Sequence, residues 1–257
     1  MIDLNNITFS YPIQKAIFQG FSWKVELGQI WAVLGPSGCG KSTLLHLLAG
    51  LQHPSTGEIS IKGETLIRPR PNTGLIIQDY GLLPWATVKQ NVNLGIRIRS
   101  FYGPDGTHAP DDYEVPGNVD YWLERLQLTP HAEKYPSQLS GGQRQRTAIA
   151  RTLALEPDLI LMDEPFSSLD APTRESLQDL VLDLQLEQKI TMIIVTHSIE
   201  EASILGKHIL LLGNPPNTTP IIQSNPGAGS DSYRESDSYQ VVCRHLRSTL
   251  DEERFQN

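Results

Sequence analysis

Two alternating patterns of hydrophobic and polar positions mark the first part of the chain. Phe21, Trp23 and Val25 alternate with polar residues, and Ile59 and Ile61 do the same between two glycines. A period of two is typical of a strand with one face buried and one face in water. The N-terminal region is therefore predicted to contain half-buried antiparallel strands.

Later segments are short and continuously apolar, which is typical of strands covered on both faces. These segments are Ile30–Leu34, Leu75–Ile77, Leu159–Met162 and Ile190–Val195. Helical patterns separate them: Lys41–Gly50 is rich in leucine, and Arg174–Gln188 carries apolar residues at the i, i+3, i+4, i+7 spacing. Buried strands that alternate with amphipathic helices predict an α/β fold, with a parallel sheet flanked by helices.

Two regions depart from this alternation. Val88–Tyr135 is mostly helical in pattern and is predicted to form an inserted lobe, interrupted by a surface loop at Gly103–Gly117 that is rich in proline, glycine and acids. After Gly213 the chain becomes polar, and only Tyr239–Leu250 is amphipathic. We expect a loosely held C-terminal tail with one short helix.

Composition narrows the class without giving a function. The chain has 257 residues, 39% hydrophobic and 19% charged, with a net charge of −8. This acidic balance argues against a nucleic-acid binder. No apolar run approaches the about 20 residues of a spanning helix, and Met1–Ser10 lacks the pattern of a secretory signal. Cys39 and Cys243 are too few for a disulfide framework, which favours a soluble protein of a reducing, intracellular compartment.

A glycine-rich loop follows Ile30–Leu34, the first of the continuously apolar segments. Gly35–Ser42 (GPSGCGKS) fits G-x-x-x-x-G-K-[ST] and lies between a predicted strand and a predicted helix, as phosphate binding requires. Backbone N–H groups and the helix N-terminus attract the anion, Lys41 can reach the terminal phosphates, and the Ser42 hydroxyl can ligate Mg²⁺. Cys39 lies close to this helix start, which predicts a lowered thiol pKa and a loss of activity when the thiol is alkylated. Alternatively, Cys39 is only a small residue that the loop tolerates.

Two carboxylates end another buried strand. Asp163 and Glu164 follow Leu159–Met162, at the sheet edge where open α/β sheets bind ligands. Asp163 can hold Mg²⁺ through water, and Glu164 can polarise an attacking water. Together with the phosphate loop, this pair predicts a nucleoside-triphosphatase that uses Mg²⁺.

Leu139-Ser-Gly-Gly-Gln143 matches the signature of ATP-binding-cassette (ABC) ATPases, just upstream of the Asp163-Glu164 strand. With Gln78, Ser167–Asp170 and His197, the motifs stand in the order of that family, which the chain resembles from about Ile2 to Gly213. The resemblance implies the ABC ATPase fold: a P-loop NTPase core, an N-terminal antiparallel β subdomain and an inserted α-helical subdomain. It places the ATPase domain at residues 1–223, with the helical subdomain at about 85–150, and the tail at 224–257.

The same resemblance implies roles for individual residues. Glu164, His197 and Gln78 would be catalytic, with His197 bonded to the γ-phosphate and Gln78 sensing the membrane partner. Tyr11 would stack on adenine, although an exposed tyrosine at a strand end is the alternative. The implied nucleotide-binding residues are Tyr11, Gly35, Pro36, Ser37, Gly38, Cys39, Gly40, Lys41, Ser42, Thr43, Ser140, Gly141, Gly142, Gln143 and Asp170. The implied metal ligands are Ser42, Gln78 and Asp163.

One phosphate loop and one signature in the chain imply two half-sites. Ser140 and the backbone of Gly141 and Gly142, at a helix that opens at about Gln143, would bind the γ-phosphate held by a second protomer. The expected partner is therefore a second ABC ATPase protomer, in a homodimer or a heterodimer with a related subunit. Asp170 would communicate between the two nucleotide sites.

The stretch Gln78–Val88 resembles importer cassettes for nitrate, sulfonates, taurine or bicarbonate. The apolar run Leu82–Trp85 is predicted to receive a helix of a membrane permease, or else to fill the core between two lobes. The resemblance implies a peripheral subunit on the cytoplasmic face of the inner membrane, with permease subunits, a solute-binding protein or domain, and no nucleic acid as partners.

Three other functions compete with this interpretation. An exporter motor is the nearest rival, and a soluble ABC ATPase acting on DNA or ribosomes is a second one, although the chain has one phosphate loop and no long coiled coil. A P-loop kinase or GTPase would lack the signature at residues 139–143.

Overall fold

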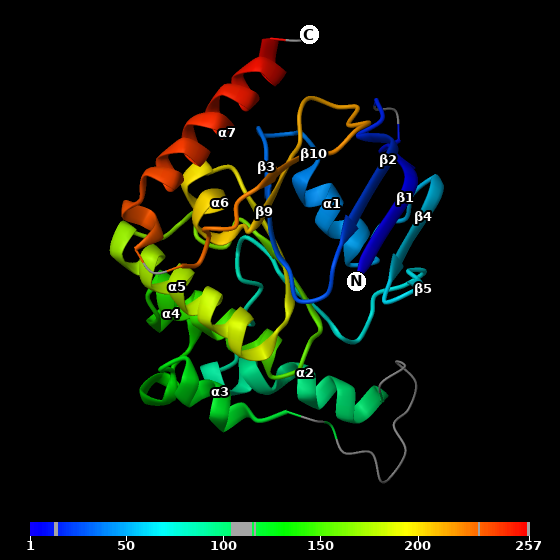
Figure 1. Ribbon diagram of the computed structural model, residues 1–257. Helices are drawn as coiled ribbons and strands as arrows, with labels where there is room; N and C mark the ends of the chain where they lie inside the picture. The colour runs from blue at the N-terminus through cyan, green and yellow to red at the C-terminus, as the bar shows by residue number, and fades with distance from the viewer. Residues whose placement is uncertain (13–14, 104–114, 116, 231, 256–257) are drawn as a thin grey trace. The chain divides into compact units, whose positions relative to one another are not determined.

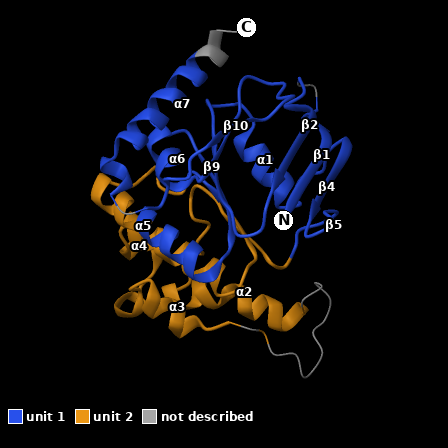
Figure 2. Cartoon of the chain, in the orientation of Figure 1, with its two compact units in different colours: residues 1–70, 161–164, 178–257 blue, residues 71–160, 165–177 orange. Residues whose placement is uncertain are grey.

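The structure, a computed structural model, describes residues 1–12, 15–103, 115, 117–230 and 232–255. The predicted surface loop at 103–117 lies almost wholly outside the described residues. The chain divides into two compact units (Figure 2). Unit 1 comprises Met1–Arg70, Leu161–Glu164 and Gln178–Asn257, and unit 2 comprises Pro71–Ile160 and Pro165–Leu177.

The N-terminal sheet of unit 1 is antiparallel, as its alternating pattern predicts. Its order is β2-β1-β4-β5, with β1 at Ile2–Phe9, β2 at Phe18–Val25, β4 at Thr56–Ile61 and β5 at Glu64–Thr65 (Figure 1). In the pairing of β1 with β2, Ile2 lies opposite Val25 and Leu4 lies opposite Trp23. All four side chains are almost fully buried, so one face of the sheet forms part of the core.

The second sheet has the order β10-β9-β3-β8-β7-β6. Its strands are β3 (Ile30–Leu34), β6 (Thr73–Ile76), β7 (Leu159–Asp163), β8 (Thr191–Thr196), β9 (His208–Leu211) and β10 (Ile221–Ser224). Strand β3 pairs parallel with β8 and with β9, and β10 closes the edge as an antiparallel strand. Strand β6 belongs to unit 2, and β7 begins in unit 2 and ends in unit 1. These pairings confirm the predicted parallel sheet, and every residue of β3 and β8 is buried, as expected for strands covered on both faces.

The C-terminal helix differs from the expected short piece in a loose tail. Helix α7 runs over Asp237–Phe255, and Leu246 is fully buried. It packs in a cluster with Ala32 and Leu34 of β3 and with Ala202 of helix α6 (Ile199–Leu205). The sequence pattern predicted a helix at Tyr239–Leu250 but neither its full length nor its packing, because an amphipathic pattern does not show which distant segment its apolar face contacts.

Unit 2 is mainly helical. It contains α2 (Val88–Tyr102), α3 (Val119–Arg125), α4 (Gly141–Leu153) and the first part of α5 (Ala171–Gln188), together with short 3₁₀ turns at Thr129–His131 and Pro136–Gln138. Helix α2 begins with a capping box, in which Thr87 accepts from the backbone of Gln90 and the Gln90 side chain accepts from the backbone of Thr87. None of the described helices is long and apolar enough to cross a bilayer.

Candidate functional site

The phosphate loop joins β3 to helix α1 (Lys41–Leu48) in unit 1. Gly40 precedes the helix at φ +108°, a conformation that side chains disfavour, and a Cβ there would lie 2.4 Å from Cγ2 of Ile17. The turn therefore requires glycine at position 40. The loop connects the buried strand β3 to the N-terminus of α1, which is the strand–loop–helix arrangement of an anion site.

Lys41 and Ser42 are the first two residues of helix α1. The Lys41 ammonium donates to the carbonyl oxygens of Gly35 and Pro36, both at 2.8 Å, so the loop holds a buried cation within itself. Ser42 is exposed, whereas Thr43 is buried and its Oγ1 lies 3.4 Å from the hydroxyl of Tyr11. This contact brings Tyr11 next to the first turn of α1.

The thiol of Cys39 has a raised pKa and not the lowered one that its place at the helix start predicted. The prediction of a lowered thiol pKa is wrong, because burial raises the pKa of Cys39 and outweighs the attraction of Lys41. Only 1% of Cys39 is exposed. The helix N-terminus that would stabilise a thiolate is present, but the surrounding protein removes the water that the charge needs. Cys39 is thus a packed residue of the loop and no longer a candidate for rapid alkylation.

Asn217 supports the loop and was not singled out from the sequence. Its Nδ2 donates to the carbonyl oxygen of Cys39 at 2.9 Å and to that of Ile17 at 3.2 Å. Its Oδ1 accepts from the backbone N–H of Gly213 at 3.0 Å. Asn217 is buried and thereby ties the phosphate loop to the segment after β9. Only its place after two prolines, in the stretch Asn214-Pro-Pro-Asn, distinguishes it in the sequence.

Glu164 and His197 meet at the carboxyl edge of the second sheet. The Nδ1 of His197 lies 3.0 Å from Oε1 of Glu164, and the Glu164 carboxyl is mostly buried whereas the histidine ring is largely exposed. Glu164 has φ +45°, which is uncommon outside glycine, and its N–H donates to the carbonyl of Val195 at 2.9 Å. Since a carboxylate only accepts, Nδ1 carries the proton of this pair and Nε2 is left to face a ligand.

The strand pairing brings Glu164 and His197 to the same edge of the sheet as the phosphate loop. Leu34 of β3 is paired with Thr196 of β8, so Gly35 and His197 leave neighbouring strands at the same level. Strand β7 is the next neighbour of β8, and the half-buried Asp163 ends it. Within unit 1 the predicted loop, Asp163, Glu164 and His197 therefore share one edge of the sheet.

The signature lies at the start of helix α4 in unit 2. Ser140 caps the helix: its Oγ accepts from the N–H of Gln143 at 3.2 Å, and the Gln143 Oε1 accepts from the N–H of Ser140 at 2.9 Å. The Gln143 Nε2 lies 2.9 Å from Nε2 of His131. A Cβ on Gly142 would lie 2.5 Å from Cγ2 of Thr173, so this position needs glycine. The helix begins at Gly141, two residues before the expected start.

Gln78 and Asp170, the other two predicted site residues, also belong to unit 2. Gln78 is exposed after β6, and Asp170 caps α5, where its two oxygens accept from the backbone and the hydroxyl of Thr173 at 3.0 Å. These bonds from Thr173 lower the pKa of Asp170. Two residues from Gln78, the Tyr80 hydroxyl lies 2.6 Å from that of Ser168, so the segments around Gln78 and Asp170 are in contact.

The turn before α2 is built around one buried amide. Asn91, which is fully buried, accepts from the N–H of Leu83 at 2.8 Å and donates to the carbonyl oxygens of Leu83, Ala86 and Thr87 at 3.0 to 3.1 Å. The turn places the Trp85 side chain outside, 73% exposed, while Leu82 and Leu83 are half-buried. Within unit 2, Trp85 thus stands on the surface.

Comparison with known proteins identifies the family. A family model described as ABC transporter matches residues 18–167, which is more than half of the chain. The chain belongs to the ABC transporter family. As an ATP-binding subunit of that family it is an ATPase coupled to transport of a solute across a membrane.

Curated relatives cover nearly the whole chain. A taurine import ATP-binding protein of Pseudomonas aeruginosa is 42% identical over 243 residues, covering 93% of this chain and 89% of the relative. An aliphatic sulfonates import ATP-binding protein of Bacillus cereus is 39% identical over 248 residues, covering 95% and 94%. A nitrate import ATP-binding protein of Synechocystis is 35% identical and covers 84% and 78%.

Solved structures agree with the fold. An ATP-binding cassette, solved as a dimer in a post-hydrolysis state bound to ADP and Pi, has a TM-score of 0.72 at 28% identity and covers 87% of this chain and 98% of that one. A structure from Clostridium perfringens, described as part of an ABC transporter complex, has a TM-score of 0.74 at 26% identity and covers 98% and 96%. The predicted ABC ATPase fold is confirmed.

Proposed function

We propose that the chain is the ATP-hydrolysing motor of a membrane importer for a small anionic solute of the nitrate, sulfonate, taurine or bicarbonate type. The names of its relatives support import: they are taurine, aliphatic sulfonates and nitrate import proteins. The geometry that supports hydrolysis is the pair of Glu164 and His197, 3.0 Å apart at the sheet edge that also carries the phosphate loop.

In this proposal the chain's own residues divide the work. Lys41 and the loop backbone bind the β- and γ-phosphates. His197, with a proton on each ring nitrogen, donates from Nε2 to an oxygen of the γ-phosphate while its Nδ1 donates to Glu164. Glu164 takes the proton of the attacking water as general base, and the bond to Nδ1 of His197 keeps its carboxylate oriented. Tyr11, beside Thr43, stacks on the adenine.

A Mg²⁺ ion fits the oxygen ligands at this edge. The exposed Ser42 hydroxyl starts α1 and the half-buried Asp163 carboxylate ends β7, both within unit 1. Few protein ligands, completed by water and substrate phosphates, are what Mg²⁺ prefers. When bound, the ion neutralises charge on the transferred phosphoryl group.

Two copies would close over two ATP molecules. The capped start of α4, with Ser140 and Gln143 at an exposed helix N-terminus, is suited to contact the γ-phosphate held by the other copy. The dimeric cassette with ADP and Pi supports this arrangement. Permease subunits would supply the pathway, with Trp85 and its turn at the contact, and a solute-binding protein would deliver the solute. The subunit would act peripherally on the cytoplasmic face of the inner membrane.

The test is the substitution Glu164→Gln, with the exposed Glu175→Gln as matched control. We expect Glu164→Gln to lower the rate of hydrolysis by about 10²- to 10⁴-fold while ATP still binds, because only the proton acceptor is lost. Sedimentation with ATP and Mg²⁺ should show a dimer for Glu164→Gln and a weaker, transient one for the control. A variant that binds ATP and stays monomeric at saturating nucleotide would contradict the proposal.

A further inference from the structure

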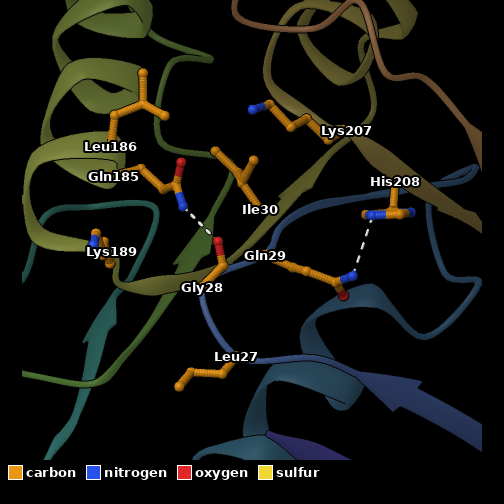
Figure 3. A pocket seen from close by; sticks show the side chains of 9 residues that line it. All are labelled: Leu27, Gly28, Gln29, Ile30, Gln185, Leu186, Lys189, Lys207 and His208. Atoms are coloured by element: carbon orange, nitrogen blue, oxygen red, sulfur yellow. Dashed lines mark hydrogen bonds between the residues drawn. The ribbon is translucent and has the colours of Figure 1, made fainter.

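A cavity of about 440 Å³ lies in unit 1, and its walls come from the segment before β3, the end of α5 and the start of β9 (Figure 3). This size falls within the range of small-molecule sites, about 300 to 1,000 Å³. Ile30, at the start of β3, forms part of its floor and is 1% exposed. Leu27 and Leu186 also line it and are 66% and 55% exposed. The cavity therefore offers an aliphatic wall that is open to water.

Two cations border this aliphatic wall. Lys189 follows α5, Lys207 precedes β9, and the cavity has no aspartate or glutamate in its lining. Neither ammonium has an ion-pair partner among the residues that the structure describes. In a chain with a net charge of −8, two unpaired lysines at one cavity favour a negatively charged ligand.

A hydrogen-bond network around Gln29 and His208 forms another side of the cavity. The Gln29 Oε1 accepts from the N–H of Glu26 at 2.9 Å and from Nε1 of Trp31 at 2.8 Å. Its amide nitrogen is thereby directed to Nε2 of His208 at 3.3 Å (Figure 3). Since an amide nitrogen only donates, Nε2 of His208 accepts and the ring is neutral. The ring also stacks on Trp31, with centroids 4.8 Å apart. The cavity's positive charge thus comes from the two lysines.

From this combination we infer that the cavity binds a small organic anion with a short aliphatic chain, such as an alkanesulfonate or an alkyl carboxylate. The charged head group pairs with Lys189 or with Lys207, which border the cavity on different sides (Figure 3), and the chain lies against the exposed leucine on its side of the cavity, Leu186 or Leu27. An inorganic anion would satisfy the lysines but leave the aliphatic wall in water, and a neutral hydrocarbon would leave the lysines unpaired. Only an amphipathic anion matches both features.

This site is separate from the nucleotide. Ile30 begins β3 and Gly35 follows its end, so the five residues of the strand hold the cavity and the phosphate loop about 16 Å apart. Strands β8 and β9 likewise start beside the cavity, with Lys189 and His208, and end at the loop's edge of the sheet, with His197 and Leu212. The inference does not depend on which solute the transporter imports.

The first experiment measures binding of 1-pentanesulfonate to the full chain by calorimetry, with saturating ADP so that the phosphate loop is filled. The double variant Lys189→Glu/Lys207→Glu should bind about tenfold more weakly, because it replaces the attraction at either side of the cavity by repulsion. Lys134→Glu, an exposed lysine of unit 2, is the matched control and should keep the affinity of the parent chain. Affinity should also fall as salt is raised. Absence of binding by the parent chain at millimolar ligand, or equal affinity of the double variant, would overturn the inference.

The second experiment varies the ligand and needs no variant. From methanesulfonate to pentanesulfonate the affinity should rise by about fourfold for each methylene that is buried. The series is then continued to decanesulfonate, and the affinity should level off once the alkyl chain outgrows the cavity. No dependence on chain length would mean that the lysines bind any anion, and a rise without a plateau would indicate a lipid-like surface; either result rejects a small-molecule cavity.

Discussion

Replacing Asn217 by alanine should loosen the phosphate loop without replacing any residue that is proposed to contact nucleotide. The side chain makes three hydrogen bonds, to the carbonyl oxygens of Cys39 and Ile17 and from the N–H of Gly213, at 2.9 to 3.2 Å. Asn217 is 8% exposed, so water does not readily replace these bonds. Of the three partners, Cys39 belongs to the loop itself.

The magnitude follows from those bonds. Each contributes about 1 kcal/mol net, and a buried group that loses its partner costs about 1 to 3 kcal/mol, so Asn217→Ala should lower the free energy of unfolding by about 3 kcal/mol. For a chain of this length that corresponds to a fall in Tm of roughly 6 to 12 °C. The KM for ATP should rise more than kcat falls, because the loop's geometry is disturbed while Glu164 and His197 keep their contact.

Urea denaturation and steady-state hydrolysis measure both effects. Asn214→Ala is the matched control, since Asn214 is exposed in the same segment and should change stability by less than about 0.5 kcal/mol. If Asn217→Ala unfolds like the control and binds ATP with unchanged KM, the amide does not hold the loop.

Three further outcomes follow from the site. Lys41→Ala should abolish measurable nucleotide binding in a fluorescent-ATP titration, and undiminished affinity would mean that the loop is not the phosphate site. Cys39, buried and with a raised pKa, should react with iodoacetamide far more slowly than a free cysteine when followed by mass spectrometry, and rapid labelling of the native chain would contradict that. Burial, with a smaller contribution from Lys207, lowers the pKa of His208, so the unfolded chain binds more protons than the folded one and stability should fall on acidification through the ordinary range of histidine. His208→Gln should show a shallower loss between about pH 7.5 and 5.5, and an equal slope would rule out this contribution.

The hydrophobic pattern of a single segment was sufficient to predict features that depend on that segment alone, such as the type of a strand. The alternation of Phe21, Trp23 and Val25 predicted an antiparallel strand, and the continuous apolar run Ile30–Leu34 predicted a buried parallel one; both are confirmed. The phosphate loop was found because its chemistry needs glycines and a lysine at fixed spacing between a strand and a helix. Strand ends shifted by one or two residues, as for β6 and β8.

Features that depend on distant segments were missed or misjudged. Asn217 acts on Cys39, 178 residues away, and no local pattern reveals that contact. The thiol pKa was predicted from the helix start alone, whereas packing around Cys39 decides it. The amphipathic stretch Tyr239–Leu250 was recognised, but its pattern does not show that Leu246 packs against β3, a strand more than 200 residues earlier in the chain.

The buried amide of Asn91 has a consequence for how this subunit can change. The Asn91 side chain hydrogen-bonds three backbone carbonyls and one backbone N–H and so fixes the backbone of the turn. None of these bonds involves the side chain of Trp85. The conformation of this turn therefore does not depend on the side chain at position 85. A substitution of Trp85 would change the exposed surface of the turn and leave its backbone unchanged.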